Sequence, residues 1–396
     1  MTGPAHQDRG GPPAHADRLT LQQVAAEVGV SAKTVSNAFT RPDQLSPATR
    51  KRVLAAAARL GYPGPDPLAA GLRRGRVGAL GFAYDNPLSY AFDDPVALAV
   101  LAGISAVAEQ AGSGLLLVPG SAPAERNSAA VASAVIDGLV VFSVADDDPL
   151  LDVVLARHLP LVVIDQPDPS SVRGPSAGGS TPWIGVDDRA AAASAATHLL
   201  ALGHRRLGVV SFGLARPRVL GMADEKAQRA ATYAVTRHRL AGYRDAVVRA
   251  GTDWSTVAVA VAPTSAVTEG AAMAAALLTR TPRPTGLLCM SDRLAEGALQ
   301  SARQLGLRVP DDLSIIGFDD APGADALQLS TVRQPNRRKG ELAAQTLLDL
   351  VARRPIEPVQ LLPTELIVRA STGPPPGMTQ RETTVVRPAG RLGRGR

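Results

Sequence analysis

The stretch TLQQVAAEVGVSAKTVSNAFTRPDQLSPATRKRVLAAAARLGY, residues 20–62, has the pattern of three short helices. It opens with Thr20 and Gln23, three residues apart, which form a capping box that satisfies the free amides at the start of a helix. Apolar residues at spacings of three and four then make one face, and Gly29 ends the helix because glycine adopts the left-handed conformation at low cost. The first helix is therefore expected over residues 21–28.

A second helix is predicted from residue 32 to about residue 39, with Ser31 as its N-cap. Two helices joined by so short a glycine-containing turn form a helix-turn-helix, a motif that many DNA-binding proteins share. Ser46 followed by Pro47 predicts the start of a third helix, because proline fits the first helical position. An all-α helix-turn-helix head is thus expected over residues 19–63.

The positive charge of the chain is concentrated at its N-terminal end. The full chain carries a formal charge of +6, and residues 1–76 contain eleven Lys or Arg against five Asp or Glu. The remaining residues therefore sum to zero. The tail from residue 373 carries +4, so residues 77–372 are near −4. A basic head on a mildly acidic body is typical of a protein that places one end on a polyanion such as DNA. A solvated basic face without a partner is the alternative.

Length and composition exclude several classes of protein. With 396 residues, 45% of them hydrophobic, the chain is long enough for more than one folded domain. No apolar run reaches the roughly 18 residues of a membrane span, and the first residues lack the apolar core of a secretion signal. The single cysteine, Cys289, excludes an internal disulfide and a cysteine-rich zinc site. We therefore expect a soluble, cytoplasmic protein without a membrane partner.

After residue 77, short apolar segments alternate with alanine-rich helical patterns. This alternation predicts parallel sheets with helices on both faces, in which ligands bind at the carboxyl ends of the strands. Polar residues directly after strands are then the candidates for ligand binding. The predicted strands cover residues 77–83, 115–118, 138–142, 161–164, 184–186, 207–211, 257–261, 286–290 and 313–317.

The ordered series of these segments resembles the lactose-repressor (LacI/GalR) family of transcription regulators. The head and the stretch PDPLAAGLRRGRVGALGF, residues 65–82, are similar to that family's DNA-binding head, hinge and first body strand. The resemblance covers roughly residues 19–372 and implies a two-lobed, periplasmic-binding-protein-like α/β body, crossed three times by the chain, with an effector between the lobes. The further matching segments are IDGLVV, LVVID, VDDRAAAASAATHLLALGHRRLGVVSF, RLAGYRDAV, SDRLAEGALQSARQLGLRVPDDLSIIGFDD and LSTVRQP.

The resemblance also implies a division of the chain into five segments. Pro67 and an additional residue before the hinge depart from the family pattern. Either Pro67 lies in the first turn of the hinge helix, which tolerates proline, or the helix expected there is shortened. Residues 213–238 form a longer segment than in most relatives, and this segment is a candidate flap over the cleft. The expected segments are a disordered tail (1–18), the helix-turn-helix head (19–63), the hinge (64–76), the two-lobed effector-binding and dimerisation domain (77–372) and a disordered basic tail (373–396).

In a helix-turn-helix, the second helix lies in the major groove with its first residues against the base edges. By resemblance, Ala32, Lys33 and Asn37 are the base-contacting residues; lysine donates to guanine and asparagine pairs with adenine. In the hinge, Leu72 is expected to wedge into the minor groove beside Ala69. The implied partners are a near-palindromic, double-stranded DNA operator and a second copy of the chain in a homodimer. The residues expected to bind phosphate, with helix capping as their alternative role, are Ser31, Thr34 and Ser36.

The same resemblance implies which residues bind the effector. An arginine with two carboxylates suits a polyhydroxylated ligand, since sugar hydroxyls both donate and accept hydrogen bonds. The implied effector is therefore a carbohydrate, and no cofactor is expected. The alternative is that these side chains cap helices or hold strand ends. The expected effector-binding residues are Asp165, Arg239, Ser291 and Asp319, with Asp85 and Gln334 as further candidates.

Two other functions fit the sequence less well. An enzyme is not expected, because the chain lacks a GxxxxGK[ST] phosphate loop, a GxSxG elbow, an HExxH motif and a GxGxxG after a strand. The six histidines are scattered, and no metal site is expected. A periplasmic sugar carrier shares the two-lobed fold, but it needs an export signal and no basic head. The sequence thus predicts an allosteric DNA-binding regulator, a repressor, rather than a catalyst.

Overall fold

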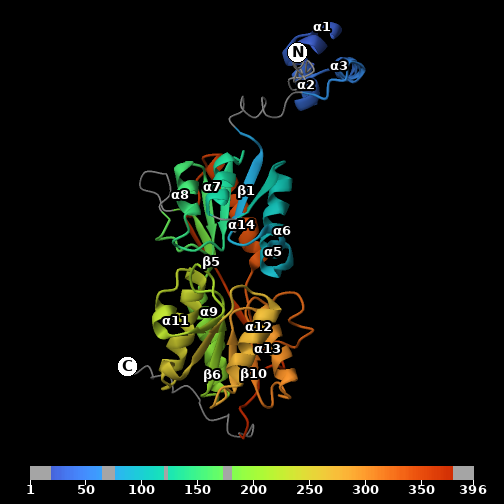
Figure 1. The fold of residues 1–396 in the computed structure, drawn as a ribbon. Helices are drawn as coiled ribbons and strands as arrows, with labels where there is room; N and C mark the ends of the chain where they lie inside the picture. Colours follow the sequence, from blue (N-terminus) through green and yellow to red (C-terminus); the bar gives the residue numbers. More distant parts are fainter. Residues whose placement is uncertain (1–18, 65–75, 120–123, 173–180, 378–396) are drawn as a thin grey trace, which may run out of the picture. The chain divides into compact units, whose positions relative to one another are not determined.

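The computed structural model describes residues 19–64, 76–119, 124–172 and 181–377 (Figure 1). The chain separates into two compact units, Met1–Val77 and Gly78–Arg396. The first unit is called the head below and the second the body. Each has a hydrophobic core of its own.

The described part of the head consists of three α-helices and one 3-10 turn. The predicted capping box is present: the amide N–H of Thr20 donates to Gln23 Oε1 at 2.7 Å, and Gly29 ends the first helix with a φ of 71°. The helices enclose a core that includes Val24, Val35 and Val53, all fully buried. The helix-turn-helix prediction is therefore confirmed. The elements are α1 (Leu21–Val28), α2 (Ala32–Thr40), η1 (Pro42–Gln44) and α3 (Pro47–Leu60).

The body is built from two lobes, each with a β-sheet and helices on both faces (Figure 1). The first lobe contains β1 (Ala79–Tyr84), α5 (Leu88–Asp93), α6 (Pro95–Gln110), β2 (Gly114–Pro119), α7 (Ala124–Ser133), β3 (Gly138–Phe142), α8 (Leu150–Ala156), β4 (Leu161–Ile164), β5 (Trp183–Val186), α14 (Asn336–Val351) and β12 (Val359–Leu362). The second lobe contains α9 (Asp188–Ala201), β6 (Leu207–Ser211), β7 (Gly221–Ala223), α10 (Glu225–Arg229), α11 (Ala234–Arg249), η2 (Trp254–Thr256), β8 (Ala258–Val261), α12 (Val267–Leu278), β9 (Gly286–Cys289), α13 (Asp292–Gln304), β10 (Ser314–Ile316), β11 (Thr331–Arg333) and β13 (Glu365–Ile367).

The strand order of the two large sheets confirms the predicted parallel α/β architecture. The first sheet has the order β12-β5-β4-β3-β1-β2, and its strands are all parallel. The second has the order β10-β9-β6-β8-β7, in which only β7 is antiparallel. The chain passes between the lobes after β5, after β11 and after β12. These are the three crossings that the resemblance implied.

All nine predicted strands are present, with ends that differ by at most two residues. Four further strands, β7, β11, β12 and β13, were not predicted. They have three or four residues each, and they lie at sheet edges or in a small two-stranded sheet. The side chains of β7, β12 and β13 are half-buried or exposed, so no buried apolar run marks these three strands in the sequence. In β11, a strand of three residues, two side chains are buried.

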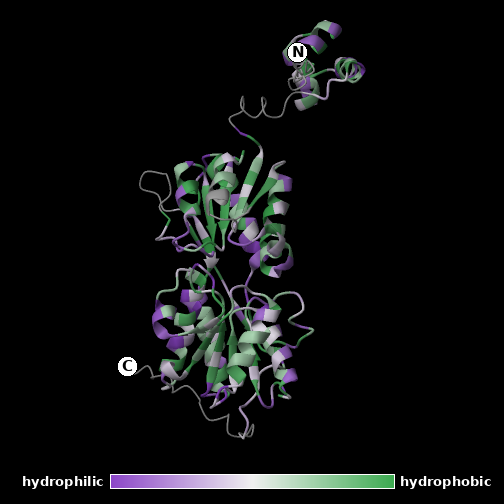
Figure 2. Ribbon diagram, viewed as in Figure 1, coloured by the Kyte–Doolittle hydropathy of each residue, from purple (hydrophilic) through white to green (hydrophobic). Residues whose placement is uncertain are grey.

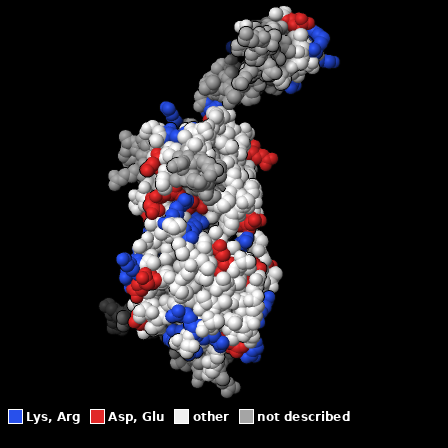
Figure 3. Space-filling model, in the orientation of Figure 1, with Lys and Arg blue, Asp and Glu red and all other residues white. Residues whose placement is uncertain are grey.

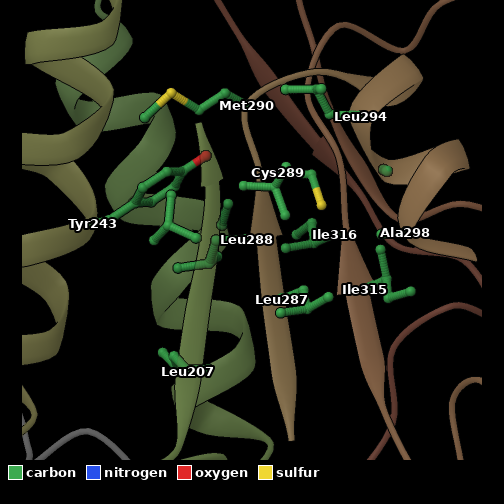
Figure 4. Close-up of a cluster of buried hydrophobic side chains, with 14 of the residues drawn as sticks. Leu207, Tyr243, Leu287, Leu288, Cys289, Met290, Leu294, Ala298, Ile315 and Ile316 are labelled. Atoms are coloured by element: carbon green, nitrogen blue, oxygen red, sulfur yellow. The ribbon is translucent and has the colours of Figure 1, made fainter. Parts of the chain in front are cut away.

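Hydrophobic residues predominate along the strands, whereas hydrophilic residues gather on the outer parts of the helices and in loops (Figure 2). Buried apolar side chains of the sheets and helices form the core of each lobe. In the second lobe, Leu287 and Cys289 of β9 lie between Tyr243 of α11 and Leu294 of α13 (Figure 4). Trp254 is also buried in this lobe, and its Nε1 donates to Gln228 Oε1 at 2.9 Å. Trp254 therefore contributes to packing.

The body extends past its predicted boundary at residue 372. The amide N–H of Gly373 donates to Ser314 Oγ at 3.0 Å, and its carbonyl oxygen accepts from the buried ring of His204 at 2.9 Å. The chain is described as far as Gly377. The expected start of the tail at residue 373 is therefore wrong, because Ser314 at the start of β10 and the buried His204 both form hydrogen bonds with Gly373.

Helices of the body approach one another most closely at glycines. A Cβ atom on Gly340 of α14 would lie 2.1 Å from the carbonyl oxygen of Val100 in α6, and one on Gly103 would lie 2.1 Å from that of Arg337. The pair α9 and α11 makes the same kind of contact at Gly242. These pairs are packed backbone to backbone, so they leave no room for a side chain at the crossing.

We predict that Gly340→Ala destabilises the protein by about 2 kcal/mol, because α6 and α14 must separate to admit the methyl group. In an ordinary helix the same substitution would stabilise by up to about 1 kcal/mol. Urea unfolding of the full chain measures the difference, with Gln345→Ala at an exposed position of α14 as the control. A Gly340→Ala variant as stable as this control would contradict the backbone contact.

Candidate functional sites

The predicted base-contacting residues lie in α2, two of them in its first turn and Asn37 past its middle. Ala32 and Lys33 are exposed and Asn37 is half-buried. Lys33 and Asn37 are four residues apart, so they lie on the same face of the helix. The Nδ2 of Asn37 donates to Gln44 Oε1 at 3.2 Å, which holds the amide and leaves its carbonyl oxygen and one N–H for another partner. A side chain in this state can still form both bonds of an asparagine–adenine pair.

The predicted phosphate-binding residues have local partners in the head. Ser31 Oγ accepts from the amide of Thr34 at 3.0 Å and lies 2.9 Å from the hydroxyl of Thr34. Ser31 therefore caps α2, the alternative role considered for it. Ser36 is half-buried, and its carbonyl oxygen accepts from Thr40. The hinge residues expected to contact DNA, Ala69 and Leu72, lie outside the described residues, as does Pro67.

The body contains a cavity between its lobes, with about 860 Å³ of empty space, part of it open to solvent. Its lining combines aromatic side chains with a few polar groups, which is typical of small-molecule sites. The chain has two Trp, five Tyr and six Phe, and five of these aromatic side chains line the cavity. They are Tyr84, Tyr90, Phe142, Phe212 and Tyr233.

Five of the six predicted effector-binding residues line this cavity, although they come from distant parts of the sequence. Strand ends supply three of them, since β4, β9 and β10 all end at the cavity. Helix α11 and the crossing after β11 supply the other two. These residues are Asp165, Ser291, Asp319, Arg239 and Gln334.

Arg239 is held rigidly at the cavity wall. Its Nε donates to Asp188 Oδ1 at 2.8 Å, and its Nη1 donates to the carbonyl oxygen of Met290 at 2.5 Å. Its guanidinium carbon lies 3.5 Å from the centre of the Phe318 ring, a cation–π contact. The side chain is almost completely buried, so it presents a pre-oriented donor to the cavity.

Asp319 lies opposite this arginine. Burial raises the pKa of its carboxyl group well above the usual range, while the charge of Arg239 acts in the other direction. Its Oδ1 accepts from Gln334 Nε2 at 2.6 Å. The backbone of Asp319 has a φ of 117°, a conformation that side chains rarely adopt and that is common at functional sites.

Ser291 both caps α13 and lines the cavity. Its Oγ accepts from the amide of Leu294 at 3.2 Å and lies 2.6 Å from the hydroxyl of Ser265. The next residue, Asp292, is buried below the cavity, and burial raises its pKa to about 7. Its Oδ1 accepts from the hydroxyl of Thr331 at 2.5 Å. The capping role and the cavity position of Ser291 are therefore compatible.

The structure does not place Asp85 in the cavity lining. Its carboxylate is turned toward the segment of residues 213–238, where it pairs with Arg216 and, at 3.1 Å, with Arg218. It also accepts from the hydroxyl of Tyr233 at 2.6 Å. Asp85 therefore pairs with side chains of the second lobe, a role that differs both from the expected effector contact and from the capping or strand-end role considered for it.

These contacts belong to a set of bonds that join the two lobes along one side of the cavity. Arg216 also pairs with Asp148 at 2.7 Å, and Arg218 donates to Asn86 Oδ1 at 2.5 Å. Arg237 pairs with Asp146 at 2.8 Å. The arginines come from the second lobe and their partners from the first. Basic and acidic side chains lie side by side near the level where the lobes meet (Figure 3).

The segment of residues 213–238 folds into β7, α10 and the start of α11. It supplies Gly213, Arg218 and Tyr233 to the cavity lining, together with the first residues of α11. The guanidinium carbon of Arg218 lies 4.8 Å from the centre of the Tyr233 ring, and both residues line the cavity. The segment is thus part of the cavity wall, and it contains regular structure that was not predicted; its role as a flap over the cleft stays a prediction.

Other polar groups of the cavity were missed in the sequence. Asp94 caps α6 and accepts from the Tyr84 hydroxyl at 3.0 Å, and burial raises its pKa. Asp94 is followed by proline, which is the signal of a helix start and could have been found. Tyr84 gave no such signal, because an aromatic residue in an apolar strand reads as core. Further polar residues of the lining that were not predicted are Asn86, Tyr90, Ser143, Gln166, Arg218, Tyr233, Thr236, Thr264, Ser265 and Arg293.

Within the described parts of the chain, no helix combines the length and apolar character needed to cross a membrane. The described residues also contain no group of three or more His, Cys, Asp or Glu that could hold a metal ion. His198 and His204 instead bond to side chains near the end of the body, His198 to Thr372 at 2.9 Å and His204 to Thr285 at 2.9 Å.

Two family descriptions match the chain. Residues 20–64 match the bacterial regulatory proteins of the lacI family, and residues 196–372 match the periplasmic binding protein-like domain. An HTH-type transcriptional regulator of Mycobacterium tuberculosis is 42% identical over 360 residues, which are 90% of this chain and 98% of that protein. The HTH-type transcriptional regulator IpsA of Corynebacterium glutamicum is 37% identical over 359 residues, 90% of this chain and 98% of that protein.

Solved structures show the same fold. A lacI-family transcriptional regulator from Corynebacterium glutamicum has a TM-score of 0.68 and 34% identity, over 89% of this chain and 98% of that one. The complex of the transcriptional regulator CelR with cellobiose has a TM-score of 0.63 and 28% identity, over 89% and 100% of the two chains. The lac repressor dimer bound to operator has a TM-score of 0.70 at 24% identity, which shows the fold alone.

We predict that Arg216→Ala destabilises the body by about 1–2 kcal/mol. The value is smaller than the 3–5 kcal/mol typical of a fully buried pair, because about a third of the Arg216 side chain is exposed. Burial already raises the pKa of Asp148, so the loss should be larger at pH 8, where this carboxylate is charged, than at pH 5. Thermal unfolding at the two pH values measures both effects.

The matched control for this substitution is Arg189→Ala. It breaks an exposed pair with Asp245, at 2.6 Å, that lies within the second lobe. Because such surface pairs contribute little, we expect hardly any change in stability. An equal loss of stability in the two variants, or the same loss at both pH values, would show that the ion pairs between the lobes stabilise the body no more than a surface pair does.

Proposed function

Because the chain belongs to the lacI family of bacterial regulatory proteins, we propose that it is a repressor controlled by a neutral sugar. In this proposal a homodimer binds a near-palindromic operator through the heads, and the sugar occupies the cavity of each body. The protein performs no catalysis, and it acts in the cytoplasm, where the chromosome is. The observation that carries the proposal is the cavity between the lobes, with Arg239 and Asp319 in its lining.

The chemistry of the cavity supports a neutral polyol as effector. Arg239 supplies fixed donors, whereas Asp319 and the hydroxyls of Ser265 and Ser291 supply acceptors. Aromatic side chains provide the apolar wall on which a sugar ring lies. The relative CelR forms a complex with cellobiose, and its chain is similar to this one over 89% of the length.

The exposed N-terminal half of α2 supports sequence-specific DNA binding. Lys33 is exposed, and Asn37, whose Nδ2 donates to Gln44, keeps its carbonyl oxygen and one N–H for a base edge. The amides at the start of α2 are suited to a phosphate. Dimeric helix-turn-helix regulators bind two DNA half-sites that are related by two-fold symmetry, one half-site for each protomer. Half-sites separated by about one helical turn are therefore expected in the operator.

Control of DNA binding follows from linkage. A sugar that contacts both lobes stabilises the arrangement in which those contacts form, and the change is passed on through residues 64–76 to the dimer's heads. Coupling of this kind is typically worth about 1–3 kcal/mol, or roughly 5-fold to 150-fold in operator affinity. Reciprocity requires that operator DNA changes the sugar affinity by the same factor.

A thermal-shift screen tests the effector half of the proposal. The panel contains D-glucose, D-galactose, D-ribose, maltose and cellobiose, with adenine and guanine as non-sugar compounds. A ligand at a hundred times its Kd adds about 2.7 kcal/mol to the stability of the native state, so its binding is visible as a rise in Tm. A response to nucleobases alone would contradict the assignment of a sugar.

We predict that Arg239→Ala and Asp319→Ala remove the rise in Tm and the effector response but leave operator binding intact. Each substitution takes away a polar group of the cavity without touching the head. Asp152→Ala, at an exposed site of α8, is the control and should respond like the wild type. A normal response in both cavity variants would disprove this use of the cavity.

We predict that Lys33→Ala and Asn37→Ala each reduce the preference for operator over random DNA by roughly tenfold or more, because each removes a base contact. Binding to random DNA should largely survive, since it depends on phosphate contacts. Fluorescence anisotropy with operator selected from genomic fragments measures both affinities. Arg59→Ala, which removes one positive charge but breaks only an exposed pair with Glu27, is the control. Equal weakening on both DNAs would refute the base-reading role.

A further inference from the structure

Lys339 is a completely buried cation in the first turn of α14. Its Nζ lies 2.7 and 2.9 Å from the two carboxylate oxygens of Asp165 and 2.6 Å from Gln334 Oε1. An ammonium group has three N–H donors, and each one has an acceptor here. A positive charge is unfavourable at the N-terminus of a helix and costly in the interior, so Lys339 depends on these three bonds.

The bonds of Lys339 form a chain between the lobes. Asp165 follows β4 in the first lobe, and Gln334 lies in the crossing between β11 and α14. The Nε2 of Gln334 donates to Asp319 Oδ1 at 2.6 Å, and Asp319 follows β10 in the second lobe. One side chain thus connects three of the residues expected to bind the effector.

The chemistry of lysine decides the orientation of Gln334. A glutamine side chain can be turned with either its oxygen or its nitrogen toward a neighbour. Lysine has donors only, so it accepts no bond from the glutamine amide and requires the carbonyl oxygen on its side. The NH₂ group of Gln334 is then directed to Asp319. With an apolar residue in place of Lys339, only the Asp319 oxygen would favour that orientation, and Gln334 Oε1 would lose its partner.

We propose that Lys339 is a positioning residue of the effector site. Asp165 is the counter-ion of Lys339. In this proposal Asp165 holds Lys339 in place and does not itself contact the ligand. Through Gln334, Lys339 also orients the donor to one oxygen of Asp319, which leaves the other oxygen to a ligand hydroxyl. The proposal rests on the effector site proposed above, and it identifies a residue that the sequence did not mark.

The charged groups around Asp165 make the effect of Lys339 measurable as a pH dependence of stability. Burial raises the pKa of Asp165, and Lys339 is the strongest influence in the opposite direction; Asp188 and Arg239 are the other charged groups that act on it. Without Lys339 the pKa rises further. A carboxyl group whose pKa is raised by folding loses its contribution to stability as the pH increases through that pKa. Removal of Lys339 should therefore cost more at pH 8 than at pH 5.

The test is thermal unfolding of the full chain at both pH values. Lys339→Met keeps an unbranched apolar stem but strands the Asp165 carboxylate, so Tm should fall by roughly 5 °C or more at pH 8 and by less at pH 5. The double variant Lys339→Met/Asp165→Asn removes both charges and should lose this pH dependence. Lys226→Met, the same substitution at an exposed site of α10, should show no pH-dependent loss.

A loss of Tm that is equal at both pH values, or that persists with the same pH dependence in the double variant, would overturn the pairing role. The positioning role is tested with D-glucose and cellobiose as probes. The double variant should bind the sugar that stabilises the wild type at least tenfold more weakly, and unchanged binding would overturn it. If neither probe nor any other panel sugar stabilises the wild type, the proposed function fails, whereas the pH comparison still decides the pairing.

Discussion

The cavity exists because two parallel sheets end against each other while the chain crosses between them three times. Parallel strands bring all their carboxyl ends to one edge, and polar residues collect there because backbone and side-chain groups at that edge need partners. The residues after β4, β9 and β10 are therefore neighbours in space although 154 positions separate Asp165 from Asp319. The geometry of the sheets, more than any single residue, determines which side chains can meet a ligand.

Several carboxyl groups at this edge are buried, and burial raises the pKa of Asp94, Asp165, Asp292 and Asp319. Each is held by specific donors, such as the Tyr84 hydroxyl for Asp94 and the Thr331 hydroxyl for Asp292. Charges of this kind are costly in an apolar interior. The body therefore gives up stability to keep a polar, pre-oriented lining, which is a common feature of binding sites.

The sequence predicted the elements well because helices and central strands depend on local patterns. The capping pair Thr20 and Gln23 and the apolar run of β4 need only neighbouring residues to be recognised. Positions in the cavity depend on strand ends, so Asp165 and Asp319 could also be predicted. Lys339 could not, because a single lysine at the start of a helix reads as a solvated charge. Its burial follows from the contact between α14 and the end of β4.

Asp85 shows the converse error. It follows a strand as Asp165 does, but the segment of residues 213–238 brings Arg216 and Arg218 to its carboxylate and withdraws it from the cavity. No local sequence pattern predicts an ion pair between residues that are more than 130 positions apart in the chain. The direction of a side chain at a strand end is thus decided by what the rest of the chain places beside it.

The glycine crossings between α6 and α14 and between α9 and α11 have a mechanical consequence. Where two helix backbones touch directly, no side chains remain between them to slide or repack, so each lobe should behave as a stiff block. Conformational change is then confined to the three segments that connect the lobes. A bound molecule can change the shape of the body only by rotating one lobe relative to the other.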